Sequence, residues 1–293
     1  MNLIELNNIS KYFGKTKAID RVNLTLAPSK IYGLLGRNGA GKTTLLNIIT
    51  NRIYPDQGIV KIEGKNVVLN DQILRNVFYM TEKNLFHEGY SLKELLYLCK
   101  DFYPSADLSY AHTLAAKFRL NLKQKIGGLS MGYLSIFKAI MALCSNAPIL
   151  ILDEPVSGLD ANHRELLYKE ILEIYAAKAQ TIIISTHLIE EIAALLEEVI
   201  IIDHGKLLLQ ESSEMLLQKA WIVTGEISKV RSFAKSMRVL NAKTLGQREE
   251  VLLFGLISQK DLIAGKNSGL DFAMASLQKL FIGLTENTEV NHE

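Results

Sequence analysis

Apolar runs of four or five residues recur through the first two thirds of the chain and predict buried strands. The clearest of them are residues 31–35, 149–152, 181–185 and 199–203. Runs of this kind suit strands that are covered on both faces, as in a parallel sheet. Shorter apolar segments predict further strands at residues 3–6 and 22–26 and after Gly58. Residues 42–49 have apolar positions at helical spacing, which predicts an amphipathic helix directly after the first buried strand.

The middle of the chain, from about residue 82 to residue 145, has a mostly helical pattern. Its expected helices are residues 91–101, 109–120 and 133–145. Because strands and helices alternate on either side of this segment, the sequence predicts an α/β core that carries a helical subdomain.

The pattern changes again from Ala220 onward. Short strands are expected at residues 221–226, 237–242 and 250–254, with helical stretches between them and at residues 275–284. This predicts a small α+β appendage without a catalytic motif. Its use is either dimer contact or regulation, or it is a stabilising extension of the core. The polar residues from Thr285 onward are expected to fray.

A glycine-rich loop joins the first buried strand to the amphipathic helix. It consists of Gly36, Arg37, Asn38, Gly39, Ala40, Gly41, Lys42 and Thr43, and Thr44 follows it. Strand, loop and helix in this order are the context that a phosphate-binding loop requires. The glycines let backbone N–H groups face phosphate oxygens, and the helix adds the positive end of its dipole. We expect Lys42 between the β- and γ-phosphates, the Thr43 hydroxyl on Mg²⁺ and Thr44 near the α-phosphate.

A second motif, I-L-I-L-D-E-P at residues 149–155, ends in two adjacent carboxylates. Asp153 stands at the carboxyl end of a buried strand, where open α/β sheets bind ligands, and is expected to hold Mg²⁺ directly or through water. Glu154 can orient the attacking water and accept its proton. Together with the phosphate-binding loop, this motif predicts an enzyme that binds and hydrolyses ATP or GTP.

Five further features make the chain resemble the nucleotide-binding subunit of an ATP-binding cassette (ABC) transporter. They are L-S-M-G-Y at residues 129–133, S-G-L-D at 157–160, S-T-H at 185–187, Glu82 at the Q-loop position and K-Y-F-G at 11–14. The resemblance implies an ABC ATPase domain over residues 1–219, with a mixed sheet and a helical subdomain at about 82–145. The appendage described above then forms an accessory domain over residues 220–293. It also implies that the chain hydrolyses ATP with Mg²⁺ to drive transmembrane transport.

The signature-like segment has two readings. On one, Ser130 is an ordinary N-cap of the helix that follows it. On the other, which the resemblance implies, Ser130 and Gly132 form an anion site for the γ-phosphate held by an opposite subunit. Two cassettes, identical or different, would then pack head to tail with two ATP molecules between them. ATP binding would close this dimer and hydrolysis would release it.

The same resemblance assigns roles to residues outside these motifs. His187 is expected to contact the γ-phosphate and hold Glu154 and the water in line, and Ser157 and Asp160 to link the two sites of the dimer. Phe13 is the expected platform for adenine. Tyr12, on the opposite face of the same strand, is the alternative, and either ring could instead belong to the core.

Three residues depart from the usual family pattern. Met131 stands in place of glycine and Tyr133 in place of glutamine, while Ser130 and Gly132 are kept. Glu82 replaces glutamine, so it can still bind Mg²⁺ but adds a negative charge toward the γ-phosphate. We expect Glu82→Gln to keep ATPase activity within about tenfold, a factor that corresponds to roughly 1.4 kcal/mol of barrier.

Composition limits the number of domains, the kinds of partner and the cellular compartment that we expect for the protein. The 293 residues are 48% hydrophobic and carry a formal net charge of +2, which suits one sizeable domain plus a small one and does not favour nucleic-acid binding. No apolar stretch of about 18 residues and no secretory signal is visible. Cys99 and Cys144 are expected to be free thiols in a reducing compartment.

We therefore expect a protein on the cytoplasmic face of a bacterial membrane, attached through a separate transmembrane permease subunit. Phe86 and Tyr90 lie in a polar loop near the Q-loop position. They either contact that permease or anchor the loop to its own core.

The motif order, the single cassette and the appendage resemble ATPases that export antibiotics, antimicrobial peptides or amphipathic toxins of the phenol-soluble modulin type. Substrate choice belongs to the permease. The alternative is a soluble cassette ATPase that acts on ribosomes or translation, although such proteins usually carry two cassettes in one chain. A DNA-repair ATPase would need a coiled-coil insertion between Lys42 and Ser130, and an unrelated P-loop kinase would leave Asp160 and His187 unexplained.

Overall fold

In the computed structural model, which describes residues 2–289, the chain forms two compact units. One comprises Met1–His187 with Ile200–Gln210, and the other Leu188–Val199 with Glu211–Glu293. The second unit thus includes residues 188–199 and 211–219, which the sequence analysis placed in the ATPase domain. These residues belong to the second unit because α7 (Ile189–Ile192) and α8 (Ser213–Gln218) contact α11 (Leu277–Glu289). The functional division at residues 219 and 220 stays a prediction.

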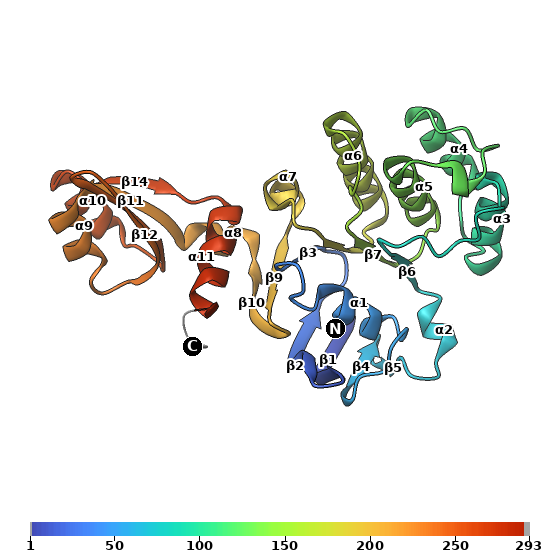
Figure 1. The fold of residues 1–293 in the computed structure, drawn as a ribbon, viewed down its shortest axis with the longest axis horizontal. Helices are drawn as coiled ribbons and strands as arrows, with labels where there is room; N and C mark the ends of the chain where they lie inside the picture. Colours follow the sequence, from blue (N-terminus) through green and yellow to red (C-terminus); the bar gives the residue numbers. More distant parts are fainter. Residues whose placement is uncertain (1, 290–293) are drawn as a thin grey trace. The chain divides into compact units, whose positions relative to one another are not determined.

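Two sheets form the framework of the first unit (Figure 1). The four-stranded antiparallel sheet has the order β2-β1-β4-β5, with β1 (Ile4–Phe13), β2 (Thr16–Leu26), β4 (Gln57–Ile62) and β5 (Lys65–Asn66). The six-stranded sheet has the order β10-β9-β3-β8-β7-β6, with β3 (Ile31–Leu35), β6 (Val77–Met80), β7 (Ile149–Asp153), β8 (Thr181–Ser185), β9 (Glu198–Asp203) and β10 (Lys206–Ser212). Because β3, β8, β7 and β6 pair in parallel, their carboxyl ends meet at one edge.

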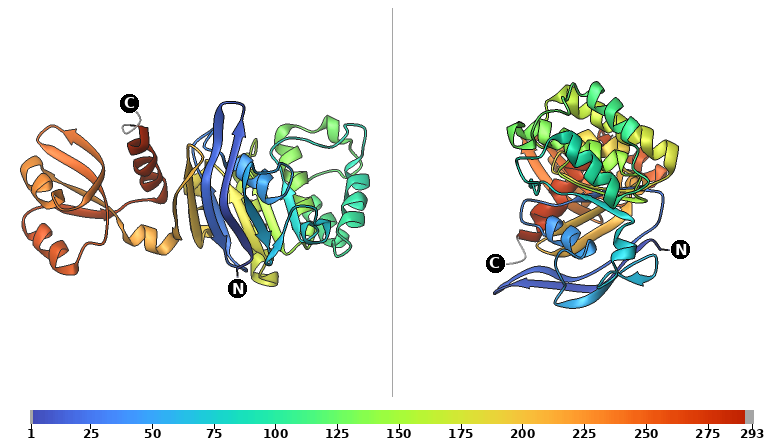
Figure 2. Two further views of the ribbon diagram at one scale, coloured as in Figure 1. Left: turned by 90° about the horizontal axis from the view of Figure 1, so that it is seen from below. Right: turned by 90° about the vertical axis from the view of Figure 1, so that its right-hand side faces the viewer.

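Helices surround this framework, and three of them form the predicted helical subdomain. The helices of the core are α1 (Lys42–Ile49), α2 (Asp71–Leu74) and α6 (Ala161–Lys178), whereas the 3₁₀ turn η2 (Ala193–Leu195) that follows α7 belongs to the second unit. The subdomain holds α3 (Leu92–Phe102), α4 (Leu108–Lys117), the turn η1 (Ile126–Gly128) and α5 (Met131–Cys144). Figure 2 shows the green helices α3, α4 and α5 gathered on one side of the first unit, away from the blue strands β1 and β2. The predicted helices of the first unit are confirmed, with ends that differ by up to three residues.

Local sequence fixes where these helices begin. Ser91 starts α3 with a capping box, since its hydroxyl accepts from the Glu94 N–H while the Glu94 carboxylate accepts from the Ser91 N–H. Asp107 caps α4 by accepting from the Tyr110 N–H.

Within residues 2–289, no helix is both long and apolar enough to cross a membrane.

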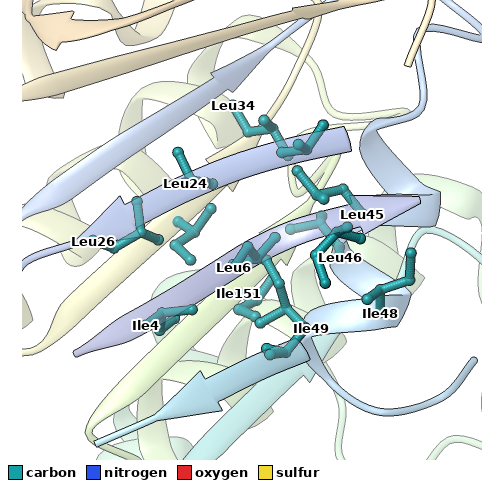
Figure 3. Packing of buried hydrophobic residues seen from close by; sticks show 14 of the residues in the cluster. Ile4, Leu6, Leu24, Leu26, Leu34, Leu45, Leu46, Ile48, Ile49 and Ile151 are labelled. Carbon is teal, nitrogen blue, oxygen red and sulfur yellow. The ribbon is translucent and has the colours of Figure 1, made fainter. Parts of the chain in front are cut away.

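The core of the first unit lies where α1 packs between the two sheets. Figure 3 shows Leu45, Leu46, Ile48 and Ile49 of α1 among side chains of the blue strands and Ile151 of β7. All of these side chains are fully buried. The helix that begins at the phosphate-binding loop is therefore fixed by its apolar face, which holds the loop rigidly against the strand ends.

The second unit contains a β-α-β-β-α-β arrangement that the sequence indicated only in outline. Its elements are β11 (Ala220–Glu226), α9 (Ile227–Ala234), β12 (Arg238–Leu245), β13 (Arg248–Phe254), α10 (Gln259–Asn267) and β14 (Asp271–Met274). The antiparallel sheet has the order β12-β13-β11-β14, which is a ferredoxin-like split βαβ unit. The three predicted strands are confirmed within a few residues, whereas β14 is a short strand that the sequence analysis missed.

The expectation that the chain frays from Thr285 is wrong for the described part of α11. The helix runs to Glu289. Thr285 is only 2% exposed, and its hydroxyl donates to the Phe281 carbonyl at 3.0 Å. A threonine that bonds back along the helix can thus stay in the core despite its polarity. Residues 290–293, also covered by that expectation, lie outside the described residues.

Candidate functional site

The glycine-rich loop joins β3 to α1 and lines a cavity of about 290 Å³. Residues 37–44 line this cavity together with Ala18 of β2, Glu82, Asp153 and Glu154. The fold thus brings loop N–H groups, a lysine, a hydroxyl and three carboxylates to one place, as the sequence predicted. Ala18 is an addition that the sequence gave no reason to select.

Gly41 shows why the loop needs glycine at its junction with α1. Its φ is 107°, and a Cβ there would lie 2.8 Å from the Ala18 carbonyl oxygen. A larger residue would be strained and would push β2 away from the loop. The close approach of Ala18 also explains why this strand residue forms one wall of the cavity.

Lys42 points back into the loop that precedes it. Its Nζ donates to the Gly36 carbonyl at 2.6 Å and to the Arg37 carbonyl at 3.3 Å. Burial lowers the pKa of Lys42, an effect that the charges of Glu154, Asp153 and Glu82 oppose. An ammonium held by carbonyls and close to three carboxylates is poised to bind an anionic ligand in the same cavity.

Asp153 is the centre of an oxygen-rich cluster at the end of β7. Its Oδ2 accepts from the Thr43 hydroxyl at 2.9 Å and from the Tyr79 hydroxyl at 3.3 Å. Its Oδ1 is buried, and within residues 2–289 it has no hydrogen-bond partner. A buried carboxylate oxygen without a partner, next to a hydroxyl and phosphate-binding N–H groups, fits a Mg²⁺ site.

Tyr79 was missed by the sequence analysis. It lies on β6, the neighbour of β7, and burial followed by the charge of Asp153 raises the pKa of Tyr79. The phenol therefore stays protonated and remains a donor to Asp153. Its position beside Asp153 follows from the parallel pairing of β6 with β7, and no short sequence motif predicts this pairing.

Glu154 and His187 come together at the ends of two paired strands. Asp153 and Ser185 are opposite each other in the β7–β8 pair, and the Glu154 N–H donates to the Ser185 carbonyl at 2.8 Å. The Oε2 atom of Glu154 lies 2.9 Å from Nδ1 of His187. This geometry can hold a carboxylate in the orientation that a general base needs.

The signature-like segment begins α5, and the N-cap reading of Ser130 is confirmed. The Ser130 hydroxyl accepts from the Tyr133 N–H at 3.3 Å. A Cβ on Gly132 would lie 2.5 Å from the Gly158 carbonyl oxygen. Ser135 also donates to the Ser157 carbonyl at 2.8 Å. The signature and the segment around Ser157 therefore contact each other within one chain, and the role of Ser130 and Gly132 toward a second subunit stays a prediction.

Asp160 has a local role that the sequence analysis did not consider. It is the N-cap of α6, where its carboxylate accepts from the His163 N–H at 2.9 Å, and its Oδ2 lies 2.8 Å from the His163 ring nitrogen Nδ1. These hydrogen bonds lower the pKa of Asp160. The His163 ring in turn packs against Phe118 and Tyr133. Tyr133, one of the departures from the family pattern, thus supports the same segment.

The two aromatic candidates for adenine lie at the end of β1. Phe13 is 53% exposed and Tyr12 is 40% exposed, so neither belongs to the core. Neither is among the described residues that line the loop cavity. The adenine role of Phe13, with Tyr12 as the alternative, stays a prediction.

Comparisons with known proteins agree with this geometry. A family model described as ABC transporter matches residues 19–157. The ABC transporter ATP-binding protein YtrB of Bacillus subtilis is 30% identical over 190 residues, which cover 65% of this chain and 65% of YtrB. The bacitracin transport ATP-binding protein BcrA of Bacillus licheniformis is 31% identical over 220 residues, 70% of this chain and 68% of BcrA. The aligned segments thus span about two thirds of these relatives.

Among solved structures, the dimeric structure of MJ0796, a bacterial ABC transporter cassette, has a TM-score of 0.65 and 24% identity. The match covers 72% of this chain and 99% of MJ0796. Fold and site together define a P-loop nucleotide triphosphatase. The chain belongs to the ATP-binding proteins of ABC transporters, and it is an ABC ATPase in which ATP hydrolysis is coupled to transport.

Proposed function

We propose that this chain powers a bacterial exporter through ATP-dependent head-to-tail dimerisation of two cassettes. The observation that carries the proposal is that Thr43, Asp153 and Glu154 line one phosphate-loop cavity, with Thr43 bonded to Asp153 and His187 in contact with Glu154. The structure of MJ0796, a cassette of the same fold, is dimeric, which supports the pairing of two cassettes.

In the proposed reaction, residues 36–44 bind the triphosphate and Glu154 accepts a proton from the attacking water. His187 holds the Glu154 carboxylate in line with that water. Thr43, Asp153 and Glu82 would hold Mg²⁺, which neutralises charge on the transferred phosphoryl group when it is bound. Ser130 and Gly132 act on the nucleotide of the opposite subunit, and Ser157 and Asp160 link the two sites.

A separate permease docks, in this proposal, on an apolar cavity of about 480 Å³ in the first unit. Phe86 lines this cavity, with Phe78, Leu98 and Phe102 close by, and Arg52 adds a cation. Phe102 is 72% exposed and Leu98 is 39% exposed, so part of this apolar lining is open to solvent as a contiguous patch. Such a surface fits an amphipathic helix of a membrane subunit. Tyr90 is not among the described residues of this cavity.

The exported molecule is, in our proposal, an antibiotic, an antimicrobial peptide or an amphipathic peptide. The similarity to BcrA, a bacitracin transport ATP-binding protein, supports this class. The chain itself would remain at the cytoplasmic face of the membrane, held there by the permease.

The proposal is tested by recovering tagged Glu154→Gln protein from detergent-solubilised host membranes in the presence of ATP, with mass spectrometry of the bound proteins. We expect a stoichiometric multi-span membrane protein, and Phe102→Glu should abolish its recovery without lowering nucleotide binding. Recovery of ribosomal proteins without a membrane subunit would refute the exporter function in favour of a translation role.

A further inference from the structure

A charged side chain lies inside the apolar packing of α5. Lys138 is flanked by Phe137 and Ala139, and all three residues are buried, with Lys138 only 5% exposed. Burying an ammonium is costly unless its three N–H groups find acceptors and its charge is offset. Such a residue in the helix that begins at the signature therefore needs a specific explanation.

Lys138 connects α5 to the Q-loop position. Its Nζ donates to the Thr81 carbonyl at 2.8 Å and to the Glu82 carbonyl at 2.6 Å. These two carbonyls follow β6 and begin the segment that leads into the helical subdomain. A charge-assisted hydrogen bond is about twice as strong as a neutral one. The lysine thus fixes the backbone from which the Glu82 side chain enters the nucleotide cavity.

The charges around Lys138 are of the sign that a buried ammonium requires. Burial lowers the pKa of Lys138 to about 8, and the negative charges of Glu82 and Asp153 oppose that fall. Both carboxylates line the loop cavity. Glu82 is also the residue that departs from the family's neutral glutamine, so this cavity contains one negative charge more than usual.

We propose that Lys138 is a positioning residue that holds the Q-loop backbone and offsets the extra negative charge of Glu82. The inference rests on the proposed function of Glu82 in the nucleotide site. The signature helix and the Q-loop are then mechanically and electrostatically linked through one side chain. Glu82 and Lys138 therefore belong together. The positive charge of Lys138 makes a glutamate at residue 82 acceptable where the family usually has a neutral glutamine.

The test combines single and double variants in a phosphate-release assay of the full chain. Lys138→Met removes both the hydrogen bonds and the charge, and we expect kcat to fall by about tenfold or more, as misplacement of a site residue can cause. In the Glu82→Gln background, where the extra charge is absent, the same change should cost at most about threefold, a coupling within the usual range for neighbouring residues. Lys138→Gln keeps donors for the two carbonyls without the charge and should show the same dependence on residue 82.

A second readout does not depend on turnover. Hydrogen exchange of the nucleotide-free protein should be faster at the amides of residues 82–86 in Lys138→Met, because the two carbonyls lose their anchor. Lys100→Met is the matched control, since Lys100 of α3 also donates to a backbone carbonyl, that of Ala106 at 3.1 Å, away from the cavity. It should change neither the exchange of residues 82–86 nor kcat.

The outcomes separate this inference from the proposed function. If the wild-type chain hydrolyses ATP and Glu154→Gln abolishes it, the proposed hydrolytic role of this site stands whatever Lys138 does, and the exporter function is tested separately by recovery of the membrane subunit. Equal losses from Lys138→Met in the wild-type and Glu82→Gln backgrounds would overturn the charge role. Unchanged exchange at residues 82–86 would overturn the positioning role, and this result can be obtained even if the variant is inactive.

Discussion

Nδ1 of His187 lies 2.9 Å from Oε2 of Glu154, and the two residues follow adjacent parallel strands, β8 and β7. Glu154 has a φ of 48°, in the left-handed region that few side chains adopt. Its N–H donates to the Ser185 carbonyl of β8, which holds the backbone in that conformation. The carboxylate is thus directed by its own backbone and by a neighbouring side chain, and both constraints come from strand pairing.

The first prediction concerns the base itself. Glu154→Gln keeps the size and the hydrogen-bonding reach of the side chain but cannot accept a proton, so we expect steady-state ATP hydrolysis to fall by at least about 10²-fold. Nucleotide affinity, measured by equilibrium binding of a fluorescent ATP analogue, should change little. A loss of hydrolysis smaller than this would remove Glu154 from the base role.

The second prediction concerns the orientation of that base. His187→Ala deletes the partner of the Glu154 carboxylate, and we expect kcat to fall by about tenfold or more with little change in nucleotide affinity, because orientation contributes mainly to the reacting state. His112→Ala, at an exposed position of α4, is the control and should hydrolyse ATP like the wild type. A His187→Ala protein whose KM rises while kcat stays constant would show that the histidine binds nucleotide only.

Much of this site could be predicted because its parts are local. The phosphate-binding loop, the strand that ends in Asp153 and the N-cap serine before α5 are each determined by residues within one short segment. Strand β3, helix α1 and strand β8 have the limits that the apolar runs indicated. Their packing is the one that an apolar helix face and fully apolar strands allow.

The site residues that the sequence analysis missed lie on a different strand or helix from the residues that they contact. Tyr79 reaches Asp153 because β6 pairs with β7, and Lys138 reaches Thr81 because α5 packs beside β6. The same holds for β14, whose edge position depends on β11. One signal was present, however, since a lysine within I-F-K-A-I interrupts an otherwise apolar helix face and indicates a buried charge with a partner.

The third prediction distinguishes the two aromatic candidates for adenine. We expect Phe13→Ala to weaken ATP binding by about tenfold, since stacking of a base on an aromatic ring is worth roughly 1–3 kcal/mol. Tyr12→Ala, the matched change at the neighbouring position, should leave affinity nearly unchanged. Isothermal titration with ATP and with inorganic triphosphate checks the cause, because only the ligand with a base should lose affinity. The opposite result for the two variants would make Tyr12 the platform.

The fourth prediction concerns why the signature keeps a glycine at residue 132. A Cβ there would lie 2.5 Å from the Gly158 carbonyl oxygen, so Gly132→Ala must push the start of α5 away from residues 157–160. Overpacking of this kind costs about 1–3 kcal/mol, and we expect a melting temperature several degrees lower even without nucleotide.

Gly128→Ala is the matched control, because a Cβ at Gly128 meets no atom within 4 Å and its backbone conformation is open to other residues. This variant should melt at the wild-type temperature. If Gly132→Ala also kept wild-type stability but lost ATP-dependent dimerisation in size-exclusion chromatography, the glycine would serve the phosphate of the opposite subunit alone. If it lost both, close packing against Gly158 would be the first reason for glycine at this position, and the shape of the dimer surface would depend on that contact.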